Sequence, residues 1–449
     1  MSRERNSSQS LTGLNGRLKN KLLGLDEHEQ RLKLHNELHT GAIDLLEAPT
    51  KVSHIVLLCD NDQADHERSL ITQLCERYDV APPTLHTNHF SAILGVFRIN
   101  WERHTEYSTY TFFYCAPFDA PFTEAAISYV PKEWLETLPG EIIAATHIAL
   151  DDGKSAKPSL KELSILFSSN TVIGSEVAAG RAIVWTDNQI HPDGFGRILI
   201  HNVELRRRQA GRLVKRLLEI ETYRMLAMLT VPLMRGYIPQ LAHFDERLAA
   251  LTEKSINLEC LEDEQHLLKE LTRLAAEIER ISAKTSQRFN ASSMYYDIVM
   301  LRISELREKR IQGLQMFHEF MDQRLSPAMA TCVLVNNKLE TISTRVERAS
   351  SLLRTRVEIT MEKQSRDLLH SMDKRAHLQL RLQETVEGLS IVVLSYYLLG
   401  LVAYGLKSIK AAGVKFDPEL ATGIAIPFVV AMVFLIIKRV RRIAHKEGG

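Results

Sequence analysis

The amino-acid sequence predicts an α+β fold, in which a mixed α/β domain is followed by a long helical coiled-coil stalk and two C-terminal transmembrane helices. Three observations carry this prediction. Short runs of β-branched and aromatic residues alternate with helical patterns in the first half of the chain. Beyond residue 203 the composition changes to long Leu-, Arg- and Glu-rich segments with few glycines. Two uncharged apolar runs then occupy residues 389–406 and 420–437.

The overall composition excludes several classes of protein. The 449 residues include 56 Lys and Arg against 55 Asp and Glu, a formal net charge of +1. A nucleic-acid binder needs a basic surplus or a basic face, so we expect no nucleic-acid partner. Five scattered cysteines form no CxxC pair, which argues against a zinc knuckle or a disulfide framework and fits a reducing, cytosolic environment.

Residues 1–39 form a basic N-terminal segment whose leucine spacing predicts a helix. His35 and His39 lie four residues apart, a spacing that lets two imidazoles share a metal on one helix face. Solvated polar side chains at a helix end are the simpler explanation of this pair.

Residues 40–203 are predicted to form one mixed α/β domain. The apolar run at 51–60 has the length of a buried strand, and residues 62–80 follow as a helix that Pro82 and Pro83 end. The further elements that we expect are a strand pair at 97–115, a strand at 141–150, a short helix at 160–167, and two strands flanking a turn at 191–194.

A helical region is predicted over residues 204–326, with a first helix that ends near Pro232, a second that begins near Glu246 and a third over 260–282. The stalk follows at 327–388. Its apolar positions, which include Val335, Leu339, Ile342, Val346 and Leu353, step by four and three as in the seam of a coiled coil. We therefore expect the chain to assemble into a homo-oligomer through its stalk and spans.

The apolar run at 389–406 holds 18 uncharged residues, which as a helix measure about 27 Å, close to the hydrocarbon thickness of a bilayer. A short external link at 407–419 leads to the second span at 420–437, and a basic tail occupies 438–449. Because positive charge near the spans stays in the cytoplasm, the tail is expected there. Two spans then place the N-terminal portion on the same side, with the lipid bilayer as a partner.

Two groups of polar residues in the α/β domain are candidate binding sites. Glu102, His104 and Glu106 alternate along a predicted strand, so two carboxylates flank one histidine, an arrangement that perturbs a pKa or binds an ion. A charged ladder on a half-exposed sheet is the alternative. The second group is Asp187, His191 and Asp193, although an Asp-Gly turn explains these residues without any chemistry.

Motifs of soluble catalysis are missing from the sequence. It contains no GxSxG, Walker loop, GxGxxG or paired-carboxylate signature, so we expect no enzyme and no cofactor, and the identity of any metal is open. On the first span Ser390, Tyr397, Gly400 and Tyr404 fall along one face, where they serve either helix packing or a pore.

The chain resembles a bacterial family of membrane-anchored proteins of unassigned function. The resemblance covers about residues 30–440 and includes the segments WERHTEYSTYTFF, VWTDNQIHPDGFGR, AGRLVKRLLEIETYRM and RLQETVEGLSIVVLSYY. It implies a bacterial inner-membrane protein and no activity, whereas the cytoplasmic placement of the N- and C-termini is expected from the charges near the spans.

The stalk and two-span C-terminus are also similar to those of CorA-type magnesium channels, pentamers whose first span lines the pore. That family ends its first span in Tyr-Gly-Met-Asn and carries Met-Pro-Glu-Leu in the link. This chain has Tyr404 and Gly405, then Lys407, and later a Pro-Glu-Leu that includes Glu419. The resemblance implies a pore mouth at these four residues and a divalent cation as partner, although a positive charge at Lys407 opposes cation entry.

Three hypotheses follow. The leading one is a non-enzymatic, membrane-anchored protein whose cytosolic α/β domain sits on an oligomerising helical stalk. The first alternative is a CorA-like ion channel or transporter. The second alternative is a ligand- or metal-sensing domain at the membrane.

Overall fold

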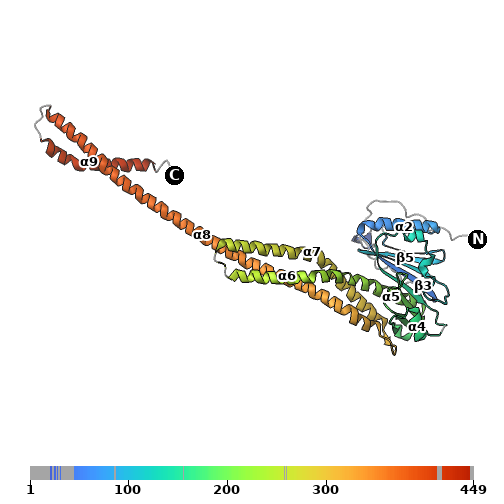
Figure 1. Ribbon diagram of the computed structural model, residues 1–449. Helices are drawn as coiled ribbons and strands as arrows, with labels where there is room; N and C mark the ends of the chain where they lie inside the picture. The colour runs from blue at the N-terminus through green and yellow to red at the C-terminus, as the bar shows by residue number, and fades with distance from the viewer. Residues whose placement is uncertain are drawn as a thin grey trace, which may run out of the picture. The chain divides into compact units, whose positions relative to one another are not determined.

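The computed structural model describes residues 45–84, 87–154, 156–256, 258, 260–411 and 417–444, with a few residues between 21 and 31. The chain divides into two compact units (Figure 1). Unit 1 comprises Met1–Ala249 and Leu274–Val346, and unit 2 comprises Ala250–Arg273 and Glu347–Gly449. A mixed sheet lies in the N-terminal part and long helices follow it, so the α+β class that the sequence predicts is confirmed.

Among the described residues, a nine-stranded mixed sheet forms the centre of unit 1, with the order β11-β8-β9-β10-β7-β3-β6-β5-β4. β7 and β10 run parallel, and the other neighbouring strands pair antiparallel. The strands are β3 Thr50–Leu58, β4 His89–Leu94, β5 Phe97–Arg103, β6 Tyr107–Tyr114, β7 Glu141–Leu150, β8 Ile173–Val177, β9 Ala182–Thr186, β10 Gly196–Asn202 and β11 Lys309–Arg310.

Six of these strands lie where the sequence predicts them, whereas β4, β8 and β11 carry too weak a pattern to be found. β4 is an edge strand with mostly half-buried or exposed side chains, β8 contains glycine and glutamate, and β11 has two residues. In the N-terminal segment the sequence predicts a helix, but β1 (Lys21–Leu22) and β2 (Leu25–Asp26) pair antiparallel. His35 and His39 lie outside the described residues.

Short helices connect the strands. They are η1 Asn61–Gln63, α2 Ala64–Arg77, η2 Ala126–Tyr129, α3 Lys132–Leu135, α4 Leu160–Leu166 and η3 Ala178–Gly180. α2 ends at Arg77, before the two prolines that the sequence analysis treats as its stop. α4 begins with a capping box, in which the Ser159 side chain accepts from the Glu162 backbone N–H and the Glu162 carboxylate accepts from the Ser159 backbone N–H.

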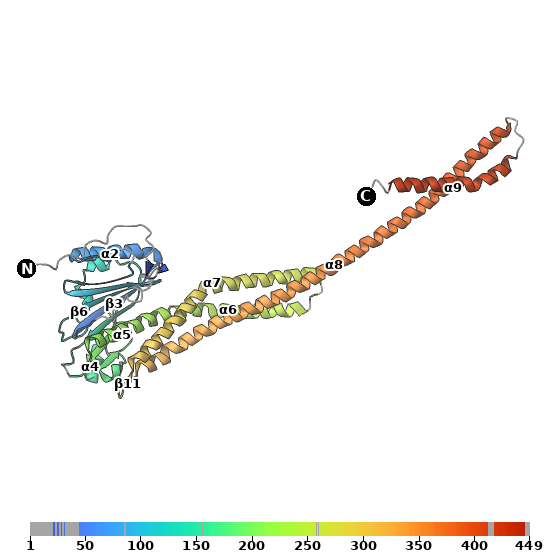
Figure 2. The ribbon, with the colours of Figure 1, turned by 180° about the vertical axis from the view of Figure 1, so that it is seen from behind.

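The sheet is covered on both faces, by α2 on one and by α5 (Arg207–Met228) on the other (Figures 1 and 2). Alternate residues of β3 pack towards α2 and towards α5, because side chains along a strand point to opposite faces of the sheet. Ile55 and Leu57 belong to the same buried cluster as Leu70 of α2. Val56 packs in a separate cluster with Leu226 of α5. Both faces of β3 are therefore buried.

Glu67 of α2 is fully buried, and four side chains from β5 and β6 donate hydrogen bonds to its carboxylate. These donors are Arg103, Trp101 Nε1 at 3.1 Å, Ser108 Oγ at 2.6 Å and Tyr110 OH at 3.3 Å. A buried carboxylate is stable only when it is paired and hydrogen-bonded. This network therefore fixes the position of α2 on the sheet.

Long helices follow the sheet: α5, α6 (Thr230–Ile256), α7 (Leu261–Leu306), α8 (Phe317–Ala411) and α9 (Pro418–Ala444). The predicted end of the first helix near Pro232 is wrong, because α5 ends at Met228 and α6 begins at Thr230. Pro232 lies in the first turn of α6, where a backbone N–H has no partner within the helix, so proline is tolerated there. The second predicted helix is the later part of α6.

α8 is a single helix of 95 residues that begins before Pro327. In unit 1 the predicted seam residues Val335, Leu339, Ile342 and Val346 are at most 5% exposed within the single chain. Asp245 of α6 pairs with two basic residues of α8, Lys338 at 3.2 Å and Arg345 at 2.7 Å. This part of the seam is therefore buried inside the chain's own helical bundle, whereas its heptad spacing predicts contacts between copies.

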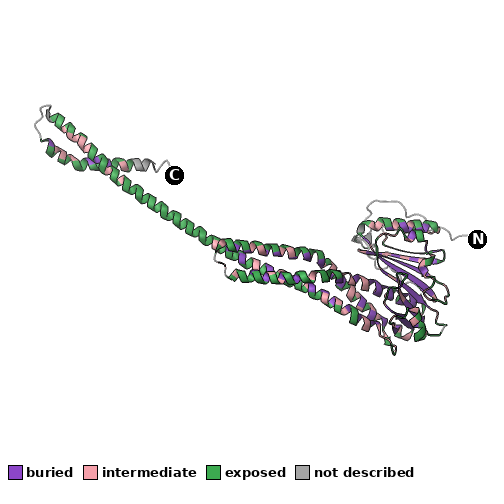
Figure 3. Ribbon diagram, viewed as in Figure 1, coloured by how far each residue is buried: buried purple, intermediate pink, exposed green. Residues whose placement is uncertain are grey.

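In unit 2, the later part of α8 has few neighbours. Every residue from 358 to 386 except Thr360 is exposed (Figure 3). Further along, Ser395 of α8 and Val429 and Val433 of α9 are buried, so the two apolar helices contact each other there. Both α8 and α9 contain a window long and apolar enough to cross a membrane, with mean hydropathy 2.0 and 2.7.

We expect Glu67→Ala to destabilise the fold by about 3–5 kcal/mol, because it leaves the buried Arg103 guanidinium without its carboxylate. Glu76→Ala, at an exposed position on the same helix, should change the free energy of unfolding by no more than about 0.5 kcal/mol. Urea unfolding of the full-length chain in detergent measures both. Equal midpoints for the two variants would show that the network does not hold α2.

Candidate functional site

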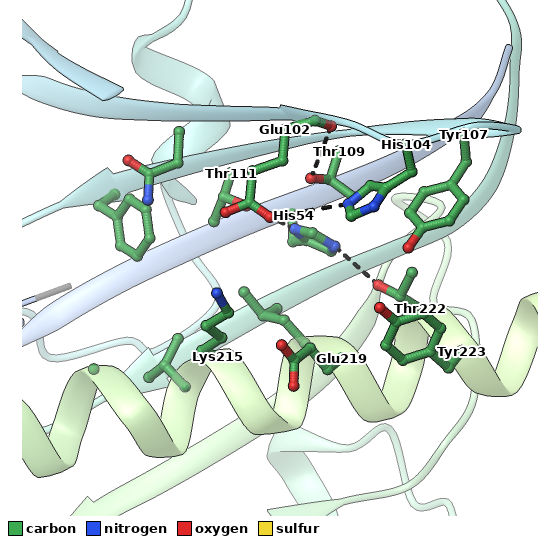
Figure 4. A pocket seen from close by; sticks show the side chains of 15 residues that line it. His54, Glu102, His104, Tyr107, Thr109, Thr111, Lys215, Glu219, Thr222 and Tyr223 are labelled. Atoms are coloured by element: carbon green, nitrogen blue, oxygen red, sulfur yellow. Dashed lines mark hydrogen bonds and ion pairs between the residues drawn. The ribbon is translucent and has the colours of Figure 1, made fainter. Parts of the chain in front are cut away.

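A pocket of about 290 Å³ lies between the sheet and α5 in unit 1 (Figure 4). This volume is at the small end of the range for ligand pockets. The sheet and the turn after β5 contribute His54, Glu102, His104, Tyr107, Thr109 and Thr111, and α5 contributes Lys215, Glu219, Thr222 and Tyr223. Charged, neutral polar and aromatic side chains therefore meet in one small cavity.

His54 of β3 forms part of the pocket wall and joins the sheet to α5. Its Nδ1 is hydrogen-bonded to Thr111 Oγ1 at 2.8 Å, and its Nε2 is hydrogen-bonded to Thr222 Oγ1 at 3.1 Å. Burial lowers the pKa of His54 from 6.5 to about 3, with a smaller contribution from His104. The ring is therefore neutral at physiological pH, and His54 adds no charge to the pocket.

Two of the binding candidates predicted from the sequence, Glu102 and His104, line the pocket at the end of β5. His104 Nε2 lies 3.9 Å from Glu102 Oε2, and the imidazole stacks on the Tyr107 ring with centroids 4.3 Å apart. Burial lowers the pKa of His104, although Glu102 opposes this shift. The neighbouring histidine is therefore a weak counter-charge for the Glu102 carboxylate.

Glu106 does not line this pocket with the other two residues, because β5 ends at Arg103 and the strand alternation stops there. The chain turns before β6, and Glu106 instead reaches α7. Its carboxylate accepts hydrogen bonds from Arg288 Nη2 at 2.6 Å and from the Tyr295 hydroxyl. Glu106 thus connects the β5–β6 turn to α7.

The α5 side of the pocket carries two charged residues one turn apart, and their surroundings differ. The Glu219 carboxylate accepts a hydrogen bond from Arg302 Nε of α7 at 2.5 Å. Lys215 is exposed and makes no hydrogen bond or ion pair with any residue that the structure describes. Tyr223 stacks on Tyr295 of α7, with ring centroids 5.5 Å apart. Among the described residues that line this pocket, Lys215 is therefore the cation without a hydrogen bond or ion pair.

Sequence reasoning missed the α5 residues of the pocket. The available signal is the spacing of Lys215, Glu219, Thr222 and Tyr223, which places four polar or amphipathic side chains along one face of a helix. This spacing does not predict which residues of the sheet the polar face of α5 will contact. The partner strand is known only once α5 is placed on β3.

Asp187, His191 and Asp193 lie in the turn between β9 and β10, away from this pocket. His191 Nε2 lies 2.9 Å from Asp187 Oδ2, and both side chains are buried. Asn170 Nδ2 donates to Asp187 Oδ2 at 2.7 Å. Asp193 accepts from the Phe195 backbone N–H at 3.1 Å. The Asp193 contact is local turn geometry, as in the alternative that the sequence leaves open. Asn170 comes instead from the loop between α4 and β8, as does Ser168, whose Oγ lies 3.4 Å from His191 Nδ1, so the turn alone does not account for the contacts of Asp187 and His191.

Metal ligands are not clustered in the part of the chain that the structure describes. No group of three or more His, Cys, Asp and Glu side chains there is placed to hold a metal ion. Glu102 and His104 thus have no third ligand of these types.

The four residues at the predicted pore mouth lie at the ends of the two apolar helices. Tyr404, Gly405 and Lys407 are exposed in the last turns of α8, and Glu419 lies in the first turn of α9. Residues 412–416, in the predicted link, are outside the described residues.

A family model with the description "Protein of unknown function (DUF3422)" matches residues 26–444. No curated protein and no solved structure matches the chain.

The neutral state of His54 predicts a pH dependence of stability. The unfolded chain binds a proton on this histidine near pH 6.5, whereas the folded chain does so only near pH 3. The contribution to stability is therefore complete above pH 6.5 and is lost as the pH falls from 6.5 towards 3, by at most about 1.4 kcal/mol per pH unit.

We expect His54→Gln to flatten the dependence of the free energy of unfolding on pH between 6.5 and 4, measured by urea unfolding of the full-length chain. His266→Gln, which replaces an exposed histidine of α7, serves as the control and should leave the slope unchanged. The slope is compared rather than the stability itself, because the glutamine also alters packing. Identical slopes in the wild type and His54→Gln would contradict the assignment.

Proposed function

The chain belongs to the DUF3422 family of proteins of unknown function, and we propose that it is a membrane-anchored oligomer that presents its α+β domain at a membrane surface. The observation that carries the proposal is the continuity of α8, Phe317–Ala411. One helix contains residues that pack in the unit 1 bundle and also the uncharged segment 389–406. The apolar segment is thus a direct extension of the folded part of the protein.

The exposure of the apolar segments supports membrane insertion. Only 6% and 11% of the two apolar windows are buried, whereas the core helix of a soluble protein is mostly buried. Exposed apolar area in water is unfavourable by roughly 25 cal/mol per Å², and lipid removes this cost. The exposed side chains include Leu389, Val392, Leu394 and Leu401 of α8, and Ile424, Phe428 and Leu435 of α9.

Charge at the ends of the hairpin supports an orientation with both termini in the cytoplasm of a bacterium. The basic run 438–442 directly follows the second apolar run, and the link between the spans holds both acids and lysines. Basic residues that flank spans are retained on the cytoplasmic side of the inner membrane. In this proposal the α+β domain lies in the cytoplasm.

Polar residues on the first span support assembly through α8. Ser395 is 5% exposed, whereas Tyr397 is 69% and Tyr404 is 74% exposed, so the tyrosines lie on a face that α9 leaves open. Ser390 lies on this face as well, at the same spacing of seven residues. The Ser390 hydroxyl donates to the Val386 backbone carbonyl at 2.9 Å within its own helix. Tyrosine hydroxyl groups that face lipid are unfavourable, and contact between copies gives those of Tyr397 and Tyr404 partners.

An ion-conducting pore is the second candidate function, and the same open hydroxyl face favours it. A pore lined by α8 requires several copies to meet along this face, with Tyr404, Gly405 and Lys407 grouped near one end. The ring of Lys407 side chains would oppose cation entry, so this candidate is the weaker one. It fails together with the oligomer if the copies do not meet there.

Membrane insertion is tested by alkaline carbonate washing of membranes that contain the full-length chain, which we expect to remain in the pellet. Val393→Arg combined with Leu401→Arg should lower the pelleted fraction, because each arginine is unfavourable by about 2.5–3.5 kcal/mol at the centre of a span. The matched control, Leu352→Arg with Ile359→Arg, alters exposed positions of the stalk and should not. Release of the wild-type chain by carbonate would reject insertion.

Assembly through α8 is tested by disulfide cross-linking in membranes, in a background where the exposed Cys115 and Cys260 are serine. We expect Tyr397→Cys to give covalent dimers and Ser395→Cys to give few, because α9 covers Ser395 within its own chain. The readout is the dimer fraction on a non-reducing gel. Equal cross-linking at both positions, or none at residue 397, would reject this contact.

A further inference from the structure

The pocket of unit 1 offers one positive and one negative charge that lack strong partners. Among the described residues, Lys215 on α5 has no hydrogen bond or ion pair, and the ion-pair partner of the Glu102 carboxylate is His104, at 3.9 Å. Both side chains extend into the cavity, from opposite walls (Figure 4). They form no ion pair with each other within 4 Å. The third charged residue, Glu219, is already balanced by Arg302.

The presence of Lys215 and Glu102 in one cavity disfavours a ligand that is only an anion or only a cation. An anion drawn to Lys215 would meet the carboxylate of Glu102 in the same small cavity, and a simple cation drawn to Glu102 would meet Lys215. Only a molecule that carries both a negative and a positive charge can pair with Lys215 and Glu102 at the same time. We infer that the pocket binds a small zwitterion of the amino-acid type, whose carboxylate pairs with Lys215 and whose ammonium group pairs with Glu102.

The other lining residues suit such a ligand. Tyr107, Phe113, Val214, Leu218 and Tyr223 supply apolar or aromatic surface for a side chain. Burial raises the pKa of both tyrosines, so their hydroxyl groups stay protonated and able to donate hydrogen bonds. The cavity of about 290 Å³ limits the ligand to the size of a single amino acid or a similarly small molecule.

This inference concerns residues of unit 1 alone, and it rests neither on membrane insertion nor on assembly. A chain that carbonate releases from membranes, or that forms no cross-link at residue 397, can still bind a zwitterion in this pocket. The two proposals therefore fail separately.

Binding is tested by isothermal titration and thermal unfolding of the full-length chain in detergent with glycine, L-alanine, L-leucine, L-glutamate and L-lysine. We expect at least one of them to bind and to raise the unfolding temperature. The analogues propionate and ethylamine each keep one of the two charges of L-alanine, and the matching pair is made for the best ligand. Each analogue should bind at least tenfold more weakly than the amino acid.

Two substitutions test whether Lys215 and Glu102 bind the charged groups of the ligand. Lys215→Met and Glu102→Gln should each weaken binding of the amino acid by about tenfold to a hundredfold, because each removes a charge-assisted contact. Both positions are at least partly exposed, so folding should be retained. Lys161→Met on α4 and Glu76→Gln on α2 remove exposed charges outside the pocket and should leave the affinity unchanged.

Three results would overturn the inference. The first is that no amino acid of the panel binds. The second is that an analogue with one charge binds as tightly as the amino acid. The third is that Lys215→Met and Glu102→Gln bind with the wild-type affinity, which would place the ligand elsewhere in the chain.

Discussion

The contact between β3 and α5 through the buried His54 is the constraint on which the candidate site depends. The imidazole bridges hydroxyl groups of Thr111 on the sheet and Thr222 on the helix, and burial keeps it neutral. A charged histidine at this place would have to leave the low-dielectric interior or take a counter-ion from the pocket. Since both nitrogens already have partners, the ring holds α5 at a distance from the sheet that leaves a cavity beside it. Glu102 and Lys215 line that cavity from the sheet and from α5 respectively.

The pocket walls are also tied to α7, so the site is part of a larger unit within unit 1. Glu106 in the turn after β5 bonds to Arg288 and Tyr295, and Glu219 on α5 bonds to Arg302. Tyr223 stacks on the same Tyr295. Each of these pairs joins a residue in or beside the pocket to α7, on the side away from α2. Partly buried ion pairs of this kind contribute modestly to stability, but they restrict the geometry of the groups they hold. These contacts therefore join both sides of the pocket to the same helix, α7.

The sequence predicts those parts of this fold whose signal is local. β3, β6 and β7 are found because apolar and β-branched residues recur along them, whereas β11 pairs with β8 from more than a hundred residues away and has two residues of its own. The site follows the same rule. Glu102 and His104 stand out as a carboxylate beside a histidine, but Lys215 becomes part of the site only through the packing of α5 on β3. The prediction that Glu106 shares a face with Glu102 and His104 is wrong for a related reason. β5 ends at Arg103, and side chains alternate between two faces only within a strand.

Apolar residues of α8 are buried by the chain's own helices in its first part and exposed in its apolar span. The seam residues from Val335 to Val346 are at most 5% exposed, because the chain's own helices cover them, and they are thus not free to join copies of the protein. Any oligomer formed by α8 has to use surface that the single chain leaves open. Isolated positions such as Leu352 are exposed earlier, but after residue 357 nearly every side chain is exposed, and this surface continues into the apolar span. The span differs from the preceding stalk in that it lacks charge, so lipid can surround it while the hydroxyl groups of Tyr397 and Tyr404 still need polar partners. The same helix thus packs within the chain near its start and is exposed near its end, where the proposed contact between copies would form.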